Sequence, residues 1–210
     1  TIAVPSGQRF NIILPDGTRV CMNAFSEMEY PSFFACKDRK EKLTGEAFFD
    51  VAHDRDKPVI VETVLCDGEV LGTSFNIEAY DDEKEMTVSV VEGRVKVTDR
   101  NETSSQVILQ PGQQAVYRDD RLAMNLVPEY EGFRWREGLI VFRDTQLGDL
   151  LKEFEKYYGV KIIADPDAIP EKVLTGKIRI SDGLDHAMWI LRNSADFSYR
   201  WNETRDIIYI

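Results

Sequence analysis

The chain has 210 residues, of which 43% are hydrophobic and 30% charged, a composition typical of one large or two small globular domains. Its formal net charge of −11 opposes binding to the phosphate backbone of a nucleic acid. No segment approaches the roughly 20 apolar residues that a membrane-spanning helix needs.

Residues 1–127 alternate apolar and polar side chains, with turn residues at short intervals and no helical period. This pattern predicts an all-β sandwich or a layered β fold. Turns are expected at Asp16-Gly17, Asp67-Gly68, Glu92-Gly93 and Pro111-Gly112. We expect Glu92-Gly93 to close a hairpin, because glycine takes positive φ at little cost. Pro111-Gly112 suits the two central positions of a type II turn.

The alternation lapses near residues 127–132, so we place a domain boundary between 1–127 and 128–210. A strand is expected at Ile140 and Phe142, with Asp144 or Thr145 as the N-cap of a following helix. The apolar face of that helix comprises Leu147, Leu150, Leu151 and Phe154. Gly159 is expected to end it in a left-handed conformation.

The same pattern returns 37 residues later, because Leu147 corresponds to Leu184 and Phe154 to Leu191. Ser181 or Asp182 is the expected N-cap of the second helix. Alternating strands are expected after each helix, around Ile162, around Tyr199 and at Ile208. The second domain is therefore predicted to be a small α+β domain of two β-α-β repeats.

Residues that usually perform chemistry are few. His53 and His186 stand far apart with no ligand-spaced Cys or His beside them, so we expect no metal site and no cofactor. Glu46 and Asp50 would lie about 13 Å apart on one strand face, too far for a retaining glycosidase pair. We therefore predict no catalytic residues and no enzymatic activity. Whether Cys21, Cys36 or Cys66 form a disulfide stays open.

Several short strings occur in an order that resembles the FecR family. They are Leu14-Pro15-Asp16-Gly17-Thr18 with Asn23-Ala24, Leu43-Thr44-Gly45-Glu46-Ala47-Phe48-Phe49-Asp50-Val51, Gly72-Thr73-Ser74-Phe75-Asn76, Val91-Glu92-Gly93 and Pro111-Gly112-Gln113-Gln114-Ala115. This family comprises membrane-bound anti-sigma factors, or sigma regulators, of cell-surface signalling in Gram-negative bacteria, and it is often met in Bacteroidetes beside nutrient-uptake transporters. The resemblance covers nearly the whole chain.

The resemblance implies a role and partners. The chain would be the periplasmic portion of a single-pass inner-membrane protein, with a membrane helix and a cytoplasmic sigma-factor-binding segment upstream of Thr1. The C-terminal repeats resemble the signalling fold called STN. In this family that region binds the periplasmic signalling domain of an outer-membrane TonB-dependent transducer. Whether the protein inhibits or also activates its sigma factor stays open.

The expected partner-binding residues lie in the second domain. Thr175, Lys177 and Arg179 alternate along one strand, and their polar face could protect a free sheet edge. Trp189 corresponds to Lys152 in the repeat, off the apolar stripe, and is expected to be exposed. An alternative function is a carbohydrate-binding β-sandwich module attached to a nutrient-uptake system, because aromatic rings stack on sugars.

Overall fold

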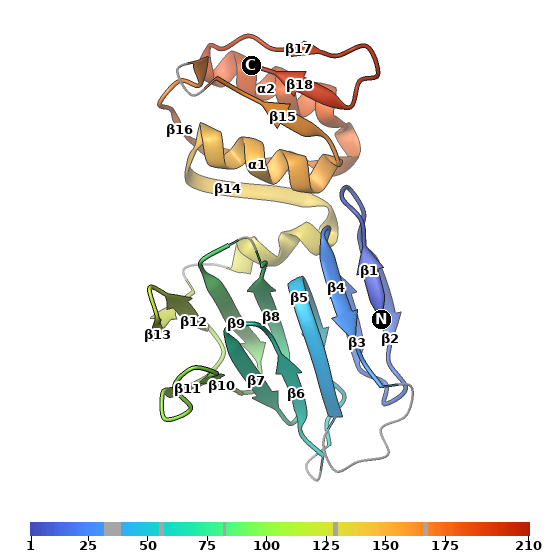
Figure 1. The fold of residues 1–210 in the computed structure, drawn as a ribbon, viewed down its shortest axis with the longest axis vertical. Coiled ribbons are helices and arrows are strands. Elements are labelled where there is room, and N and C mark those ends of the chain that lie inside the picture. The colour runs from blue at the N-terminus through green and yellow to red at the C-terminus, as the bar shows by residue number, and fades with distance from the viewer. Residues whose placement is uncertain (32–38, 55–56, 82, 128–129, 166–167) are drawn as a thin grey trace. The chain divides into compact units, whose positions relative to one another are not determined.

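The computed structural model of the chain describes residues 1–31, 39–54, 57–81, 83–127, 130–165 and 168–210. It divides into two compact units, shown in Figure 1. The β-unit consists of Thr1–Val4 and Arg9–Tyr130, and the α/β-unit consists of Pro5–Gln8 and Glu131–Ile210. The boundary that the sequence predicts at residue 128 lies outside the described residues.

The β-unit is built from strands, as the sequence predicts. They are β1 (Ile2–Val4), β2 (Phe10–Ile13), β3 (Arg19–Met22), β4 (Ser26–Glu29), β5 (Arg39–Asp50), β6 (Val59–Glu62), β7 (Cys66–Val70), β8 (Ser74–Ala79), β9 (Met86–Glu92), β10 (Val95–Asp99), β11 (Gln106–Leu109), β12 (Gln113–Arg118) and β13 (Arg121–Leu126). One sheet has the order β1-β4-β5-β6-β7-β10-β11, and the other has the order β2-β3-β5-β8-β9-β12-β13.

Strand β5 belongs to both sheets. Its first half pairs with β4 and with β6, the latter in parallel, and its second half pairs with β3 and β8. Gly45 lies at the change of sheet with φ +100°, and a Cβ there would come within 2.6 Å of the Ser26 Cα. The backbone of β4 therefore leaves room only for glycine at this position.

The core of the β-unit lies between the two sheets. It is formed by the alternating inward residues of both sheets, including Phe49 and Phe75, whose rings stack at 5.2 Å. Both are fully buried. The stacked pair joins β5 to β8 across the middle of the core, where aromatic contacts add to simple burial.

Two of the predicted turns are confirmed. At Pro111-Gly112 the Gln113 N–H donates to the Gln110 carbonyl (3.0 Å), and Gly112 has φ +82°, as a type II turn requires. Asp16-Gly17 lies between the paired strands β2 and β3, with Gly17 at φ +88°.

The hairpin predicted at Glu92-Gly93 and the turn predicted at Asp67-Gly68 are both wrong. Glu92-Gly93 closes no hairpin, because β9 pairs with β8 and β12 while β10 pairs with β7 and β11. The turn instead carries the chain from one sheet to the other. Asp67-Gly68 lies inside β7, where a Cβ on Gly68 would contact Ile77 and Val95 at 3.7 Å. Gly68 is thus a small residue over the core rather than a turn residue.

The α/β-unit contains two helices and short strands. After a 3-10 segment η1 (Tyr130–Glu137) come β14 (Leu139–Gln146), α1 (Leu147–Tyr158), β15 (Lys161–Ile163), β16 (Val173–Arg179), a 3-10 turn η3 (Ile180–Asp182), α2 (Leu184–Ala195), β17 (Arg200–Trp201) and β18 (Ile207–Tyr209). Strands β14 and β16 form an antiparallel pair, and β15-β18-β17 form a second sheet. The two strands of each β-α-β repeat therefore lie in different sheets.

The predicted repeat is visible in the helices, because α1 and α2 each have 12 residues and begin 37 positions apart. Their apolar faces form the core of this unit, with Leu150, Phe154, Met188 and Leu191 almost fully buried. Gly159 ends α1 at φ +68°, as predicted, and Asp196 ends α2 at φ +51°.

The N-cap predictions are wrong. The caps are Gln146 and Gly183, and neither makes a side-chain capping hydrogen bond. Strand β14 runs directly into α1, and Asp144 lies at an irregularity of the β14–β16 register with φ +48°. Asp144 is thereby held in the strand and cannot serve as the cap.

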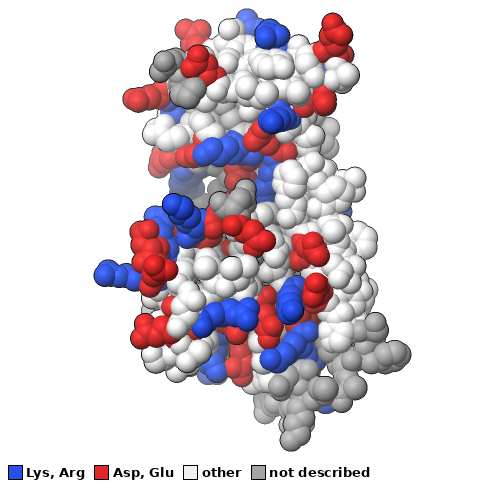
Figure 2. Space-filling model, viewed as in Figure 1, with Lys and Arg blue, Asp and Glu red and all other residues white. Residues whose placement is uncertain are grey.

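None of the helices in the described part of the chain has the length and apolarity needed to cross a bilayer. Over the face in Figure 2, acidic and basic side chains of the described residues are intermingled.

Candidate functional site

Three of the strings that resemble the FecR family meet at one buried carboxylate in the β-unit. Glu46 accepts hydrogen bonds from the amide of Asn23 (2.7 Å) and from the amide of Asn76 (3.1 Å). All three side chains are at most 4% exposed. A buried carboxylate is tolerated only when donors replace its water, and these asparagines supply them.

The same network fixes the turn between β3 and β4. The Ser26 hydroxyl donates to the Glu46 carbonyl (3.1 Å), and the Tyr80 hydroxyl donates to the Ala24 carbonyl (3.0 Å). Phe25, at the tip of this turn, has φ +56° and is 54% exposed. The polar strings thus build a rigid connection, and their role in this unit is structural.

A second contact joins the Gly72–Asn76 string to the Val91-Glu92-Gly93 string. The Thr73 hydroxyl donates to the Arg94 carbonyl (2.9 Å), and a Cβ on Gly93 would lie 2.7 Å from the Thr73 Oγ1. A Cβ on Gly72 would meet His53 Nδ1 at 2.3 Å. The glycines are needed because other segments of the same chain approach their Cα atoms closely.

A third polar group lies on the inner side of β5. Arg39 is 2% exposed; it forms an ion pair with Asp16 and donates to the Lys57 carbonyl (2.6 Å). Burial raises the pKa of Asp16, but hydrogen bonds from Thr18 and Arg39 outweigh it, so that the net pKa is lowered.

Glu41 is fully buried, and neither of its carboxylate oxygens has a hydrogen-bond partner. Burial first, and then the negative charge of Asp16, raise the pKa of Glu41 to about 8, while Arg39 opposes that shift. Glu41 is therefore mostly protonated at neutral pH.

The arrangement of acids in the β-unit does not resemble a hydrolytic pair. Asp50 forms an ion pair with Arg19 (2.6 Å) and accepts from the Ser74 hydroxyl (3.0 Å), while Glu46 is enclosed among amides. Among the described residues, no group of three or more His, Cys, Asp or Glu side chains could hold a metal ion. Burial raises the pKa of the Cys66 thiol to about 12, which makes it a poor nucleophile. Cys36 lies outside the described residues.

Within the part of the chain that the structure describes, strand β16 of the α/β-unit has a sheet partner on one side only. It pairs with β14, and its side chains at Thr175, Lys177 and Arg179 are exposed. The Thr175 hydroxyl accepts from the Asp144 N–H (2.9 Å), which ties the start of this strand to the irregularity in β14. The structure thus places these three predicted residues on one exposed face of an edge strand.

The direction of the β16 backbone groups follows from the two ends of its ladder. The Lys172 carbonyl accepts from the Leu147 N–H (2.8 Å), and the Ile180 N–H donates to the Gly138 carbonyl (2.8 Å). Residues that bond to the partner alternate in an antiparallel ladder, so even-numbered residues of β16 face β14. The N–H and C=O groups of Thr175, Lys177 and Arg179 therefore point to the other edge.

Strand β15 is also an edge strand, but its outward backbone donor, the Ile162 N–H, already makes a hydrogen bond. Its odd-numbered residues bond to the β18 side, since the Lys161 N–H donates to Asp206 and the Ile163 carbonyl accepts from Ile210. The outward N–H of Ile162 donates to the Glu155 Oε1 of α1 (2.6 Å). A side chain of the same unit therefore covers this edge, which is one way that proteins protect edge strands.

Trp189, on α2, is 59% exposed and stacks on His186 with ring centroids 6.0 Å apart. The exposure predicted from its place off the apolar stripe is confirmed.

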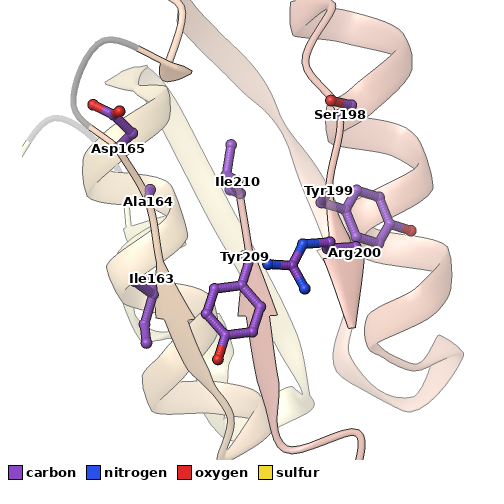
Figure 3. Close-up of a pocket in the computed structure, with 8 residues that line it drawn as sticks. All are labelled: Ile163, Ala164, Asp165, Ser198, Tyr199, Arg200, Tyr209 and Ile210. Atoms are coloured by element: carbon purple, nitrogen blue, oxygen red, sulfur yellow. The ribbon is translucent and has the colours of Figure 1, made fainter. Parts of the chain in front are cut away.

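A groove of about 600 Å³ opens on the β15-β18-β17 sheet. Figure 3 shows Tyr209 on the central strand with the Arg200 guanidinium reaching toward it. The guanidinium carbon lies 4.4 Å from the ring centroid. Asp165 and Ser198 line opposite ends of this groove.

Comparison with known proteins places these features in a family. A family model for "FecR protein" matches residues 1–96, and a model for "FecR, C-terminal" matches residues 139–209. Two crystal structures of a "putative anti-sigma factor" from Parabacteroides distasonis ATCC 8503 are similar to this chain. The first is 30% identical, with a TM-score of 0.86, over 99% of this chain and 96% of that one. The second is 31% identical, with a TM-score of 0.85, over 99% and 97%.

These matches define a regulatory rather than a catalytic class of protein, the membrane-anchored anti-sigma factors with a periplasmic part. The chain belongs to the FecR family. No curated protein is similar enough to match.

Two residues of interest were missed by reasoning from the sequence. Glu155 lies on the helix face that the sequence pattern predicts to be exposed to solvent. Its hydrogen bond with the Ile162 N–H depends on how the helix packs beside β15. Glu41 stands in the charged run Arg39-Lys40-Glu41-Lys42, which gives no sign of which face is buried.

Proposed function

We propose that this chain is the periplasmic part of a membrane-anchored anti-sigma factor whose α/β-unit binds the periplasmic signalling domain of a TonB-dependent outer-membrane transducer. In this proposal a segment upstream of Thr1 crosses the inner membrane and binds the sigma factor. Binding of the transducer at the α/β-unit changes the activity of that regulator.

The observation that carries the proposal is the edge of β16 inside the region that matches the C-terminal model of the family. A strand from the transducer domain would add to this edge and bond to the outward backbone groups, while Thr175, Lys177 and Arg179 contact its side chains. The β15 edge is the poorer candidate, because Glu155 occupies its donor.

Trp189 fits the same role. Exposed tryptophans on rigid helices are frequent anchors of protein interfaces, and the stack on His186 limits the rotamers of this side chain. The likeness of the unit to the STN fold remains part of this proposal.

The test is calorimetric titration of the chain with the isolated periplasmic signalling domain of a TonB-dependent transducer encoded beside it. We expect a 1:1 complex that is weakened at least tenfold by the Lys177→Glu/Arg179→Glu double variant. Lys161→Glu, an exposed charge reversal on β15, is the matched control and should bind as the parent chain does. Absence of any complex would overturn the proposed partner, and equal loss in both variants would overturn the assignment to β16.

A further inference from the structure

Strand β16 is basic, although the chain as a whole has a net charge of −11. Strands β14 and β16 together carry three basic residues, Arg143, Lys177 and Arg179, and a single acid, Asp144. Lys177 and Arg179 are both exposed, and they share a face of β16 because they are two positions apart. One end of the open edge of β16 is therefore cationic.

The neighbouring strand β14 places no acid opposite these two cations. Arg179 is directly opposite Leu139, and Lys177 is directly opposite Val141. The ion pairs of the described residues do not include Arg179. A strand added to the open edge would supply the second cross-strand neighbour of each cation. Opposite charges at directly opposed positions stabilise a strand pair, and like charges destabilise it.

The other end of the β16 edge has a different character. The Thr175 hydroxyl accepts from the Asp144 N–H (2.9 Å) and donates to the Asp144 Oδ1 (3.3 Å), so an exposed carboxylate lies beside Thr175. Val173, two positions before it on the same face, is apolar and 48% exposed. An acidic side chain opposite Thr175 would meet the like charge of Asp144, which disfavours a strand that is acidic at this end.

From this gradient we infer that β16 recognises a strand with acidic side chains opposite Lys177 and Arg179, a neutral side chain opposite Thr175 and an apolar one opposite Val173. The inference rests on the proposed function, and it specifies the strand of the transducer domain that binds. Because the charges stay exposed at the rim, they contribute to partner selection and association rate more than to affinity.

The direction of the added strand is also part of the inference. Strand β14 already pairs with β16 in antiparallel orientation, and antiparallel pairs are the commoner kind in sheets. An antiparallel strand runs from Arg179 toward Val173. Its acidic residues therefore come first, and the one opposite Arg179 precedes the one opposite Lys177.

The first test measures the salt dependence of binding to the isolated periplasmic signalling domain of the transducer. Between about 50 and 500 mM NaCl we expect the Kd of the parent chain to rise about fivefold or more, because salt screens exposed charge pairs. Lys177→Gln/Arg179→Gln should bind more weakly at the lower salt and lose most of this dependence. Lys161→Gln, which removes an exposed charge from β15, is the matched control and should behave as the parent does.

The outcomes separate this inference from the proposed function. A complex whose salt dependence is the same in the double variant and the parent overturns the acidic strand and leaves docking at the α/β-unit standing. Absence of any complex overturns the proposed partner, and the acidic strand with it. Circular dichroism verifies that each variant is folded.

The second test fixes the pattern and the direction. Amide hydrogen exchange of the transducer domain, with and without the chain, locates the added strand as the segment that becomes protected. A protected strand without two acidic residues at alternate positions overturns the inference. Replacing the first of these acids by lysine should restore binding to Arg179→Glu, and replacing the second should restore it to Lys177→Glu. The reverse assignment overturns the antiparallel direction, and rescue of neither variant overturns recognition by charge.

Discussion

The two units differ in where their notable polar and aromatic groups lie: buried and paired in the β-unit, at the surface in the α/β-unit. In the β-unit, Glu46, Arg39 and Asp16 are enclosed and bonded to partners of the same unit. In the α/β-unit, the outward backbone of β16 and the ring of Trp189 face the surface. The family strings that are easiest to recognise thus mark the scaffold, and the proposed docking residues belong to a region with few sequence signals.

The strongest way to break the scaffold is a single methyl group at the sheet crossing. Gly45→Ala would bring a Cβ within 2.6 Å of the Ser26 Cα at a φ of +100°. We expect the β-unit to lose about 3 kcal/mol or more of stability, measured by urea unfolding. Gly148→Ala on α1 is the control, since nothing lies within 4 Å of its added Cβ, and it should be neutral or slightly stabilising.

The polar network gives the next largest effect. Glu46→Ala leaves the buried amides of Asn23 and Asn76 without their common acceptor. We expect a loss of about 3 kcal/mol, because unsatisfied buried donors cost about 1–3 kcal/mol each. In a double-mutant cycle with Asn23→Ala the two losses should not add; additive losses would show that the bond between them contributes little.

Glu41 predicts a pH dependence confined to the β-unit. With a pKa raised from 4.5 to about 8, the folded state binds a proton that the unfolded state releases, so stability falls as pH rises from 4.5 to 8 and then levels off. At pH 7 the loss from this group is about 3 kcal/mol. Glu41→Gln should lack this pH dependence, so the stability of the parent relative to the variant should fall as pH rises from 4.5 to 8. Parallel curves across that range would contradict the assignment.

The smallest effect concerns the difference between the edge of β16 and the edge of β15. Glu155→Ala removes the acceptor of the Ile162 N–H at a partly exposed site, and we expect a loss of about 1 kcal/mol. Amide exchange at Ile162 should accelerate, while exchange at Gly176, which faces β14, should hold its rate. Unchanged exchange at Ile162 would mean that the β15 edge is protected by something other than Glu155.

The sequence correctly predicted features that depend only on neighbouring residues, namely the two helices and the Pro111-Gly112 turn. The apolar spacing at Leu147 and Leu184 located both helices, and Pro111-Gly112 predicted its turn, because side-chain period and backbone φ are properties of neighbouring residues. The partners of β9 and β10 could not be predicted, since a turn at Gly93 fits a hairpin and a change of sheet equally well.

In the candidate site, too, features set by neighbouring residues could be predicted and features set by contacts between distant elements could not. The exposure of Trp189 followed from its place off the helix stripe, whereas the cover that Glu155 gives to β15 depends on a contact between a helix and a strand. The burial of Glu41 was hidden because all four residues from Arg39 to Lys42 are charged. A run without apolar residues has no alternation, so its sequence does not show which side chains face inward.

The shared strand β5 determines how the β-unit can come apart. Neither sheet can open at its centre without breaking pairs that β5 makes, and the same strand holds the other sheet together. The central strands should therefore behave as one cooperative foldon, in which slowly exchanging amides of both sheets become accessible in the same rare event. A protease acting on this unit would encounter either a closed scaffold or a wholly opened one, with little populated between them.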